Sequence, residues 1–283
     1  MQVIDELRMK ETIQNKFDMT GKTALITGAA GLLGKQFALA LGQAGANLVL
    51  ADLNLDLASA NANELQKEGY QAVAVRVDVT NPDSCREMVE EALENFGSLD
   101  VLINSAALDP KFDASNLSKQ GANAFEEYSL DAWRQALDVN LTGTFLASQA
   151  SAQAMLKQGR GVIINICSTY GLVGPDQRLY ERPDGNNSFK PVYYSVTKAG
   201  ILGFTRYLAA YYAGKNIRVN ALTPGGVYVD HDEVFVQNYS ARTILGRMAN
   251  LDEMSGAMLF LCSDASSYMT GSNLVVDGGW TAW

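Results

Sequence analysis

Tyr194 and Lys198 stand four positions apart, and a tyrosine and a lysine at this spacing can do proton chemistry that neither does alone. On a helix, both side chains would lie on one face. A free tyrosine titrates near ~10, but a neighbouring cation favours the phenolate and lowers that pKa. Reaching ~7 takes about 4 kcal/mol, more than one partly solvated lysine usually supplies, so a second positive charge is expected beside Tyr194. Such a pair also occurs by chance on amphipathic helices, so other residues must support it.

A glycine-rich turn stands between a short apolar strand predicted for residues 23–27 and a helical pattern that runs to Gly45. This context makes glycines spaced three apart a candidate phosphate-binding turn. Gly28 would permit the tight turn, Gly31 would let the backbone approach a pyrophosphate, and Gly34 would allow close packing of helix on strand. A turn that serves only the fold is the alternative. The predicted cofactor contacts in this turn are Gly28, Gly31, Leu32, Leu33 and Gly34.

Asp52 ends a second buried strand, predicted for residues 47–52, and follows the first glycines by roughly 20 residues. An acid at that position accepts hydrogen bonds from the ribose hydroxyls of an adenosine and repels a 2′-phosphate. It therefore favours NAD over NADP, and no arginine or lysine immediately follows it. Asp52 could also cap the helix predicted for residues 53–68, and both roles can coexist. With NAD bound, the oxidised nicotinamide ring would supply the second positive charge beside Tyr194.

The remaining chain alternates strands with helices. Strands are predicted for residues 72–77, 100–104, 161–167, 217–222 and 274–276, and helices for 82–96, 130–157, 191–212 and 251–262. This alternation implies an α/β fold class, a doubly wound parallel sheet with helices on both faces. We expect a single domain of residues 19–283 after a leader of residues 1–18. Ligands of such sheets bind beyond the carboxyl ends of the strands, where Asp78, Asn104, Ser105 and Ala106 fall.

Three other segments are less regular. The polar loop of residues 109–129 is longer than a compact connection requires and is a candidate substrate lid. Residues 169–190, rich in Gly, Pro, Asp and Asn, are expected to form a long surface excursion with a function. Residues 227–240 are expected to be mobile.

Composition narrows the range of partners. The 283 residues are 47% hydrophobic, enough for a sizeable core, and their formal net charge of -9 includes no run of Lys or Arg. This argues against nucleic acid and membrane partners and favours a small molecule. Cys85, Cys167 and Cys262 are widely separated and odd in number, as buried thiols in a reducing cytoplasm would be. A single histidine, His231, argues against a metal site, and we find no membrane span or secretion signal.

Six stretches of the chain match a known pattern in order. They are Thr27 to Gly34, Asp78-Val79, Asn104-Ser105-Ala106-Ala107, Asn140, Ser168 with Tyr194 and Lys198, and Pro224-Gly225. From about Met19 to its end, the chain thus resembles the short-chain dehydrogenases/reductases. The resemblance implies a Rossmann-like fold and hydride transfer between NAD and an alcohol or ketone.

The resemblance also implies a role for each matching residue. Tyr194 would be the general acid/base, Lys198 would bind the nicotinamide ribose and lower the tyrosine pKa, Ser168 would bond the reacting oxygen, and Asn140 would hold a water of the proton relay. Val79, Pro224, Gly225 and Val227 join the expected cofactor contacts. Structural alternatives remain: Ser168 could be a turn residue with Thr169 as a rival hydroxyl, and Asn140 could mark a helix bend or a buried amide bonded to backbone.

The chain departs from the family pattern in several places. The segment between Ser168 and Tyr194 is about twice the usual length, so an insertion near residues 175–190 should loop out beside the active site, in addition to that near 109–129. Val229 stands where many members carry a threonine that contacts the carboxamide. The glycine turn, the insertions and the aromatic tail of residues 279–283 resemble bacterial flagellin-modification oxidoreductases of legionaminic-type sugar synthesis.

This narrower resemblance implies a polyhydroxylated, sugar-like substrate. Arg178, Arg182, Lys190 and Lys111 could pair with its phosphate or could be solvated surface charges. Tyr180 and Trp280 could stack on a sugar or pack at a subunit contact. The expected protein is a cytoplasmic NAD-dependent oxidoreductase, a homotetramer or homodimer whose interface would use the C-terminal helix and tail. The alternatives are the same chemistry on a small non-sugar alcohol or ketone and a non-catalytic NAD-binding sensor, which would not need all four site residues.

Overall fold

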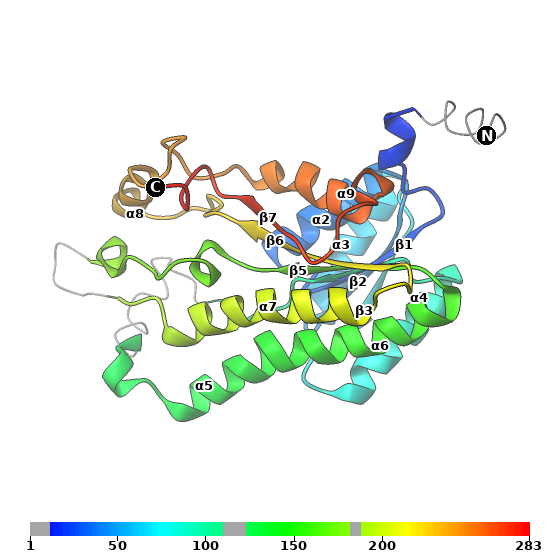
Figure 1. Ribbon diagram of the computed structural model, residues 1–283, viewed down its shortest axis with the longest axis horizontal. Helices are drawn as coiled ribbons and strands as arrows, with labels where there is room; N and C mark the ends of the chain where they lie inside the picture. The colour runs from blue at the N-terminus through cyan, green and yellow to red at the C-terminus, as the bar shows by residue number, and fades with distance from the viewer. Residues whose placement is uncertain (1–11, 110–122, 182–187) are drawn as a thin grey trace.

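One parallel sheet of seven strands runs through residues 12–109, 123–181 and 188–283, the part of the chain that this computed structural model describes (Figure 1). The strands are β1 (Thr23–Thr27), β2 (Asn47–Asp52), β3 (Ala72–Arg76), β4 (Val101–Asn104), β5 (Gly161–Ile166), β6 (Ile217–Pro224) and β7 (Asn273–Val276). Their order is β3-β2-β1-β4-β5-β6-β7, which confirms the predicted fold class. The order changes direction between β1 and β4, and sheets of this kind bind ligands at that switch point.

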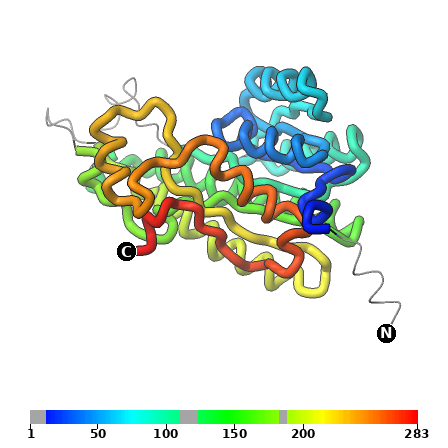
Figure 2. Tube along the Cα trace, turned by 90° about the horizontal axis from the view of Figure 1, so that it is seen from above, coloured from blue at the N-terminus to red at the C-terminus, as the bar shows by residue number. Residues whose placement is uncertain are grey.

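Helices cover both faces of the sheet because its strands are apolar on both sides. In β1, Ala24 and Ile26 belong to one core and Leu25 belongs to the other. The first face carries α2 (Leu32–Gln43), α3 (Leu55–Lys67) and α9 (Ser255–Cys262), and the second carries α4 (Pro82–Phe96), α6 (Gly143–Gln158) and α7 (Val192–Tyr211). Seen from above, α9 runs alongside α2 (Figure 2).

The helix predicted for residues 130–157 is interrupted in its middle. It consists of α5 (Leu130–Leu137), a π-helical turn at Asp138–Thr142, and α6. A π turn inserts one extra residue and changes the direction of the side chains in it. The hydroxyl of Thr144 donates a hydrogen bond of 2.9 Å to the carbonyl oxygen of Asn140 inside this turn. The expected helix bend at Asn140 is therefore present as a π turn.

Two helix starts differ from the sequence prediction. Asp52 does not cap α3; the side chain of Asn54 does, by accepting a hydrogen bond of 3.1 Å from the amide of Leu57. The cap belongs to Asn54 because α3 begins at Leu55 and not at residue 53. The helix predicted for residues 251–262 begins with a 3-10 turn, Leu251–Met254, before α9.

The segments expected to be mobile or on the surface are partly packed into the fold. Residues 227–240 include α8 (Glu233–Ser240), which is anchored by buried Phe235 and Tyr239. The long excursion after β5 includes a 3-10 turn, Gln177–Tyr180, and both Leu179 and Tyr180 are buried. Apolar side chains in both segments explain the difference, because burying them in one cluster is favourable.

The leader and the first insertion are described only in part. Residues 14–17 form a 3-10 turn, and Met19 is fully buried in the core. Residues 1–11, residues 110–122 of the candidate lid and residues 182–187 of the second insertion lie outside the described residues. None of the helices in the described part is both long and apolar enough to span a membrane.

Candidate active site

Tyr194 and Lys198 lie in the first two turns of α7, with exposed fractions of only 9% and 6%. The ammonium Nζ of Lys198 lies 5.8 Å from the ring centroid of Tyr194. It donates a hydrogen bond of 2.9 Å to the carbonyl oxygen of Ile166, the last residue of β5. The predicted shared face is confirmed, and the end of β5 holds the lysine in place.

Ser168 starts the short turn that follows β5, and its hydroxyl accepts a hydrogen bond of 3.2 Å from the amide of Tyr170. Ser168 is thus a turn residue, as the structural alternative stated. Its side chain also forms a hydrogen bond with Tyr194. Burial raises the pKa of Tyr194 well above its usual value, the carboxylate of Asp109 raises it further, and a hydrogen bond with Ser168 opposes both. Burial also lowers the pKa of Lys198. Burial thus favours the neutral phenol of Tyr194.

Asn140 connects three parts of the site through its buried side-chain amide. Its Oδ1 accepts a hydrogen bond of 2.7 Å from the amide of Leu108, and its Nδ2 donates to the Leu108 carbonyl oxygen at 3.2 Å. The same Nδ2 donates to the hydroxyl of Thr197 on α7, also at 3.2 Å. The alternative of a buried amide bonded to backbone is thus correct, and Asn140 ties the segment after β4 to the helix of Tyr194.

The glycine-rich turn requires glycine at two of its positions. Gly28 has φ +69°, and a Cβ there would lie 2.8 Å from the backbone of Ala106, so only glycine fits. At Gly34, a Cβ would collide with the carbonyl oxygen of Gly28, as expected for close packing of α2 on β1. Gly31 precedes α2 and gives it no side-chain cap. The first turn of α2, which contains Leu32 and Leu33, can therefore receive an anion on its backbone amides.

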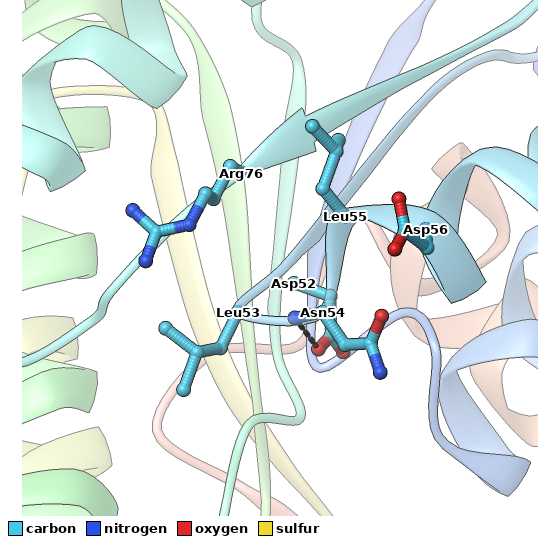
Figure 3. Close-up of a pocket in the computed structure, with 6 residues that line it drawn as sticks. All are labelled: Asp52, Leu53, Asn54, Leu55, Asp56 and Arg76. Atoms are coloured by element: carbon cyan, nitrogen blue, oxygen red, sulfur yellow. Dashed lines mark hydrogen bonds between the residues drawn. The ribbon is translucent and has the colours of Figure 1, made fainter.

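A cavity of about 580 Å³ lies at the ends of β2 and β3 (Figure 3). It is lined by Asp52, Leu53, Asn54, Leu55, Asp56 and Arg76. The carboxylate of Asp52 accepts hydrogen bonds from the amide of Ala30 in the glycine turn (3.0 Å) and from the amide of Asn54 (2.9 Å). Asp52 thus stands where an adenosine ribose would lie if a pyrophosphate occupied the turn.

Sequence reasoning missed Arg76 at this cavity. Arg76 ends β3 and stands opposite Asp52 in the strand register. The sequence search for a cation considered only the residues that immediately follow Asp52. Pairing of the predicted strands 47–52 and 72–77 would have revealed Arg76, because parallel neighbours end at the same edge.

Asp78 and Val79 follow β3, near this end of the sheet as predicted. Asp78 accepts hydrogen bonds from the hydroxyl (2.7 Å) and the amide (2.9 Å) of Thr80, and these bonds lower its pKa. Val79 is buried and packs so closely on Gly143 that a Cβ on this glycine would lie 2.6 Å away. Both residues therefore shape the chain path toward α4 and α6.

Asn104, Ser105 and Ala106 lie at the carboxyl end of β4. The side chain of Asn104 is buried and donates hydrogen bonds to Ser148 (2.9 Å) and Asn165 (2.8 Å). The amides of Ser105 and Ala106 donate to the hydroxyl of Thr27 at 3.2 and 3.3 Å. The side chain of Asn104 thus serves the core, so any cofactor contact from this stretch would use backbone or the side chain of Ser105.

Pro224 ends β6, and Gly225 and Val227 follow it. The amide of Gly225 donates a hydrogen bond of 2.8 Å to the carbonyl oxygen of Val276, and a Cβ on Gly225 would lie 2.7 Å from the backbone of Asp277. Val227 forms an isolated parallel bridge with Ala249. These contacts place the segment at the same edge of the sheet as β4 and β5.

Two of the four charged residues proposed for a phosphate, Arg178 and Lys190, form ion pairs within the chain. Arg178 pairs with Asp176 at 2.8 Å. Lys190 pairs with Asp109 at 2.7 Å and is buried, so the alternative of a solvated surface charge is wrong for Lys190. Arg182 and Lys111 lie outside the described residues.

Tyr180 and Trp280 are both buried within the chain, so the structure contradicts their assignment to a sugar face or a subunit contact. The hydroxyl of Tyr180 donates to that of Tyr170 at 3.1 Å. Trp280 stacks on Tyr239 of α8, with ring centroids 4.3 Å apart. Both side chains are buried because aromatic rings pack favourably on one another in a single cluster.

Within the described residues, no three His, Cys, Asp or Glu side chains are grouped to hold a metal ion. Cys85, Cys167 and Cys262 are buried free thiols, as predicted. Burial raises the pKa of Cys85 to about 11 and that of Cys262 to about 12, so these thiols stay protonated at neutral pH.

A family model described as Enoyl-(Acyl carrier protein) reductase matches residues 28–281, most of the chain. The chain is 32% identical to cyclohexanol dehydrogenase from Acinetobacter sp., over 97% of its own length and 100% of the relative. It resembles a solved short-chain type dehydrogenase/reductase from Mycobacterium marinum with a TM-score of 0.83 and 32% identity, over 96% of this chain and 100% of the other. The chain belongs to the short-chain dehydrogenase/reductase family.

This short-chain dehydrogenase also resembles a gluconate 5-dehydrogenase from Burkholderia cenocepacia J2315, solved in complex with NADP and tartrate. The TM-score is 0.82 at 29% identity, over 96% of this chain and 100% of the other. The dehydrogenase described here is accordingly an oxidoreductase that acts on CH–OH groups or the corresponding ketones, with NAD or NADP as its cofactor.

Proposed function

We propose that this short-chain dehydrogenase transfers a hydride between NAD and a secondary alcohol or ketone of a sugar-like substrate. The meeting of Ser168, Tyr194 and Lys198 in one buried cluster carries the proposal. A bound nicotinamide supplies the hydride acceptor or donor. The protein then needs a base within hydrogen-bond reach of the alcohol and a hydroxyl that orients it.

The residues of the cluster and Asn140 have different roles in this proposal. Tyr194 takes the hydroxyl proton of the alcohol during oxidation and returns it during reduction. Lys198 stabilises the phenolate and binds the ribose of the nicotinamide. Ser168 orients the reacting oxygen. Asn140 holds Leu108 and Thr197 in place through its side-chain hydrogen bonds. It would also hold the water that accepts the proton from the site.

The preference for NAD rests on Asp52. Its carboxylate is held by two backbone amides at the end of β2, where it would accept hydrogen bonds from ribose hydroxyls and repel a 2′-phosphate. Gly28, Gly31 and the first turn of α2 would bind the pyrophosphate. Arg76 opposes this preference, and the gluconate 5-dehydrogenase was solved with NADP, so cofactor choice needs a direct measurement.

Two observations favour a polyhydroxylated substrate. The Lys190–Asp109 ion pair adds polar groups beside Tyr194, and the related gluconate 5-dehydrogenase was solved with tartrate. The resemblance to flagellin-modification oxidoreductases extends this to a sugar of nonulosonic acid synthesis for surface or flagellar glycans.

A small alicyclic alcohol is the second candidate substrate. Leu108, Tyr128 and Trp133 pack against the buried cluster that contains Tyr193 and Tyr194, and the rings of Tyr128 and Tyr193 lie 6.1 Å apart. A cyclohexanol dehydrogenase is also among the relatives. These side chains would suit a substrate with an apolar ring.

The decisive experiment is the near-ultraviolet absorbance of nicotinamide when the protein meets NAD or NADP and a panel of alcohols. The panel contains sugars, sugar phosphates, nucleotide sugars, aldonic acids and cyclohexanols. We expect NAD reduction with one sugar class, abolished in Tyr194→Phe. Reduction with cyclohexanols alone would replace the sugar proposal by the second candidate. Binding of NAD without turnover on any member would favour a non-catalytic sensor.

We also propose a cytoplasmic homodimer or homotetramer. Three buried free thiols suit a reducing compartment. Phe145 and Leu156 on α6 and Tyr207 and Tyr211 on α7 are exposed apolar side chains that suit an interface. One side of α9 packs on α2 of the same chain, and the use of the C-terminal helix in an interface stays a prediction. Sedimentation equilibrium would give the number of subunits.

A further inference from the structure

A second cation of the chain itself lies against Tyr194. The ammonium Nζ of Lys190 is 3.9 Å from the ring centroid of Tyr194, nearer than the 5.8 Å of Lys198. The side chain of Lys190 has an exposed fraction of 8%, so little water screens its charge. We propose that Lys190 is a positioning residue of the reaction, a second cation that stabilises the phenolate of Tyr194. This inference rests on the proposed role of Tyr194 as acid and base.

The described part of the second insertion holds Lys190 against the ring of Tyr194. The side chain of Gln177 accepts a hydrogen bond of 2.9 Å from the amide of Lys190 and donates one of 3.2 Å to its carbonyl oxygen. Gln177 begins the 3-10 turn that buries Leu179 and Tyr180 in the aromatic cluster. The backbone of Lys190 is thus attached to a packed part of the fold, and its side chain is held from the other end by Asp109.

Asp109 and Lys190 act on Tyr194 in opposite directions. The carboxylate of Asp109 raises the pKa of Tyr194, after burial the largest cause of that rise. A cation over an aromatic ring is attracted to it, and more strongly when the ring oxygen is ionised. The carboxylate is 56% exposed while the ammonium is almost fully buried, so water screens the destabilising charge more than the stabilising one. Lys190 thus favours the phenolate of Tyr194, and Asp109 favours the neutral phenol.

Other titratable groups face this cluster from every side. They are Lys198 and Tyr193 on α7, Cys167 after β5, Tyr170 and Tyr180 in the two 3-10 turns that follow, and His231 before α8, next to Asp230 and Asp232. They are the same in all variants of Lys190 and Asp109. Differences between those variants therefore report on the Lys190–Asp109 pair.

The test measures the ionisation of residue 194 directly, without substrate or cofactor. The full chain carries 3,5-difluorotyrosine at position 194, whose phenol ionises at lower pH than tyrosine, and fluorine NMR follows its titration. We expect Lys190→Met to raise the midpoint by about one pH unit, and Lys190→Arg to restore it. Asp109→Asn should lower the midpoint. The double variant should lie between Lys190→Met and Asp109→Asn, since it removes both charges.

An unchanged midpoint in Lys190→Met and in Asp109→Asn would overturn the inference, as would a parent signal that stays protonated wherever the chain is folded. Circular dichroism checks the fold of each variant. Should Lys190→Met not fold, Lys190→Gln takes its place. The inference then requires a higher midpoint in Lys190→Gln and a lower midpoint in Asp109→Asn. Failure of the proposed function is distinct, because it would show as turnover that survives Tyr194→Phe whatever the titration gives.

Discussion

Asp52 and Arg76 stand opposite each other at the ends of β2 and β3, so one cavity holds a carboxylate and a guanidinium (Figure 3). Among the residues that the structure describes, no carboxylate lies within salt-bridge distance of Arg76. The two charges have opposite preferences for a 2′-phosphate on adenosine. We expect Asp52 to prevail because two backbone amides fix its carboxylate, whereas Arg76 is exposed.

Asp52→Ala should weaken the preference for NAD over NADP about tenfold, since it removes a repulsion of about 1–2 kcal/mol. Dissociation constants of NADH and NADPH, measured by nicotinamide fluorescence, give the ratio. Asp56→Ala is the matched control, because Asp56 lines the same cavity and carries the same charge. An unchanged ratio in Asp52→Ala would remove Asp52 from cofactor selection.

Arg76→Gln should have the opposite effect. We expect it to weaken binding of NADPH about tenfold, through the loss of a charge-assisted contact, and to leave NADH within about twofold. The same fluorescence titration measures both constants. Equal losses of affinity for NADH and NADPH would mean that Arg76 contacts the adenosine but does not bind the 2′-phosphate.

Tyr194→Phe should fold, bind NADH normally and lose at least about a hundredfold in kcat/KM, because it removes the acid/base group. Steady-state kinetics on the substrate identified by the panel measures the loss. The control is Tyr193→Phe, which removes a hydroxyl from the neighbouring buried tyrosine and should leave turnover nearly intact. If both variants behaved alike, the base would lie elsewhere.

The direction of the pH dependence follows from the raised pKa of Tyr194, which burial and Asp109 cause. Oxidation needs the phenolate, so most molecules must lose a proton before they react at neutral pH. We expect kcat/KM for oxidation to rise with pH through the neutral and alkaline range and kcat/KM for reduction to fall at its alkaline end. Profiles in both directions test this. An oxidation rate that falls as pH rises would contradict Tyr194 as the base.

Asn140→Ala should destabilise the fold as well as impair turnover. It leaves the amide and carbonyl of Leu108 without their side-chain partner, which costs about 1–3 kcal/mol for buried groups. Urea unfolding measures the free energy. Thr197→Val removes the hydrogen bond from Asn140 and the one that the Thr197 hydroxyl donates to the Tyr194 carbonyl oxygen, and it should cost less because both bonds of Asn140 to Leu108 remain. Unchanged stability in Asn140→Ala would mean that water replaces the amide.

Local patterns in the sequence were enough to predict the sheet and the core of the site. Alternating apolar strands and helices implied the parallel sheet, because each strand had to be covered on both faces. The spacing of Tyr194 and Lys198 on one helix and the turn at Gly28 are short-range relations, and both are present. Helical and turn geometry follow from neighbours in the chain.

Only the tertiary structure brought together charges that are far apart in sequence. Strand pairing places Arg76 opposite Asp52, and Lys190 meets Asp109 and Tyr194 because the described part of the insertion packs its apolar side chains into the aromatic cluster. The π turn at Asn140 likewise depends on packing between α6, α7 and the segment after β4. Charge and distance in a folded chain depend on which surfaces are buried together, and no local spacing encodes that.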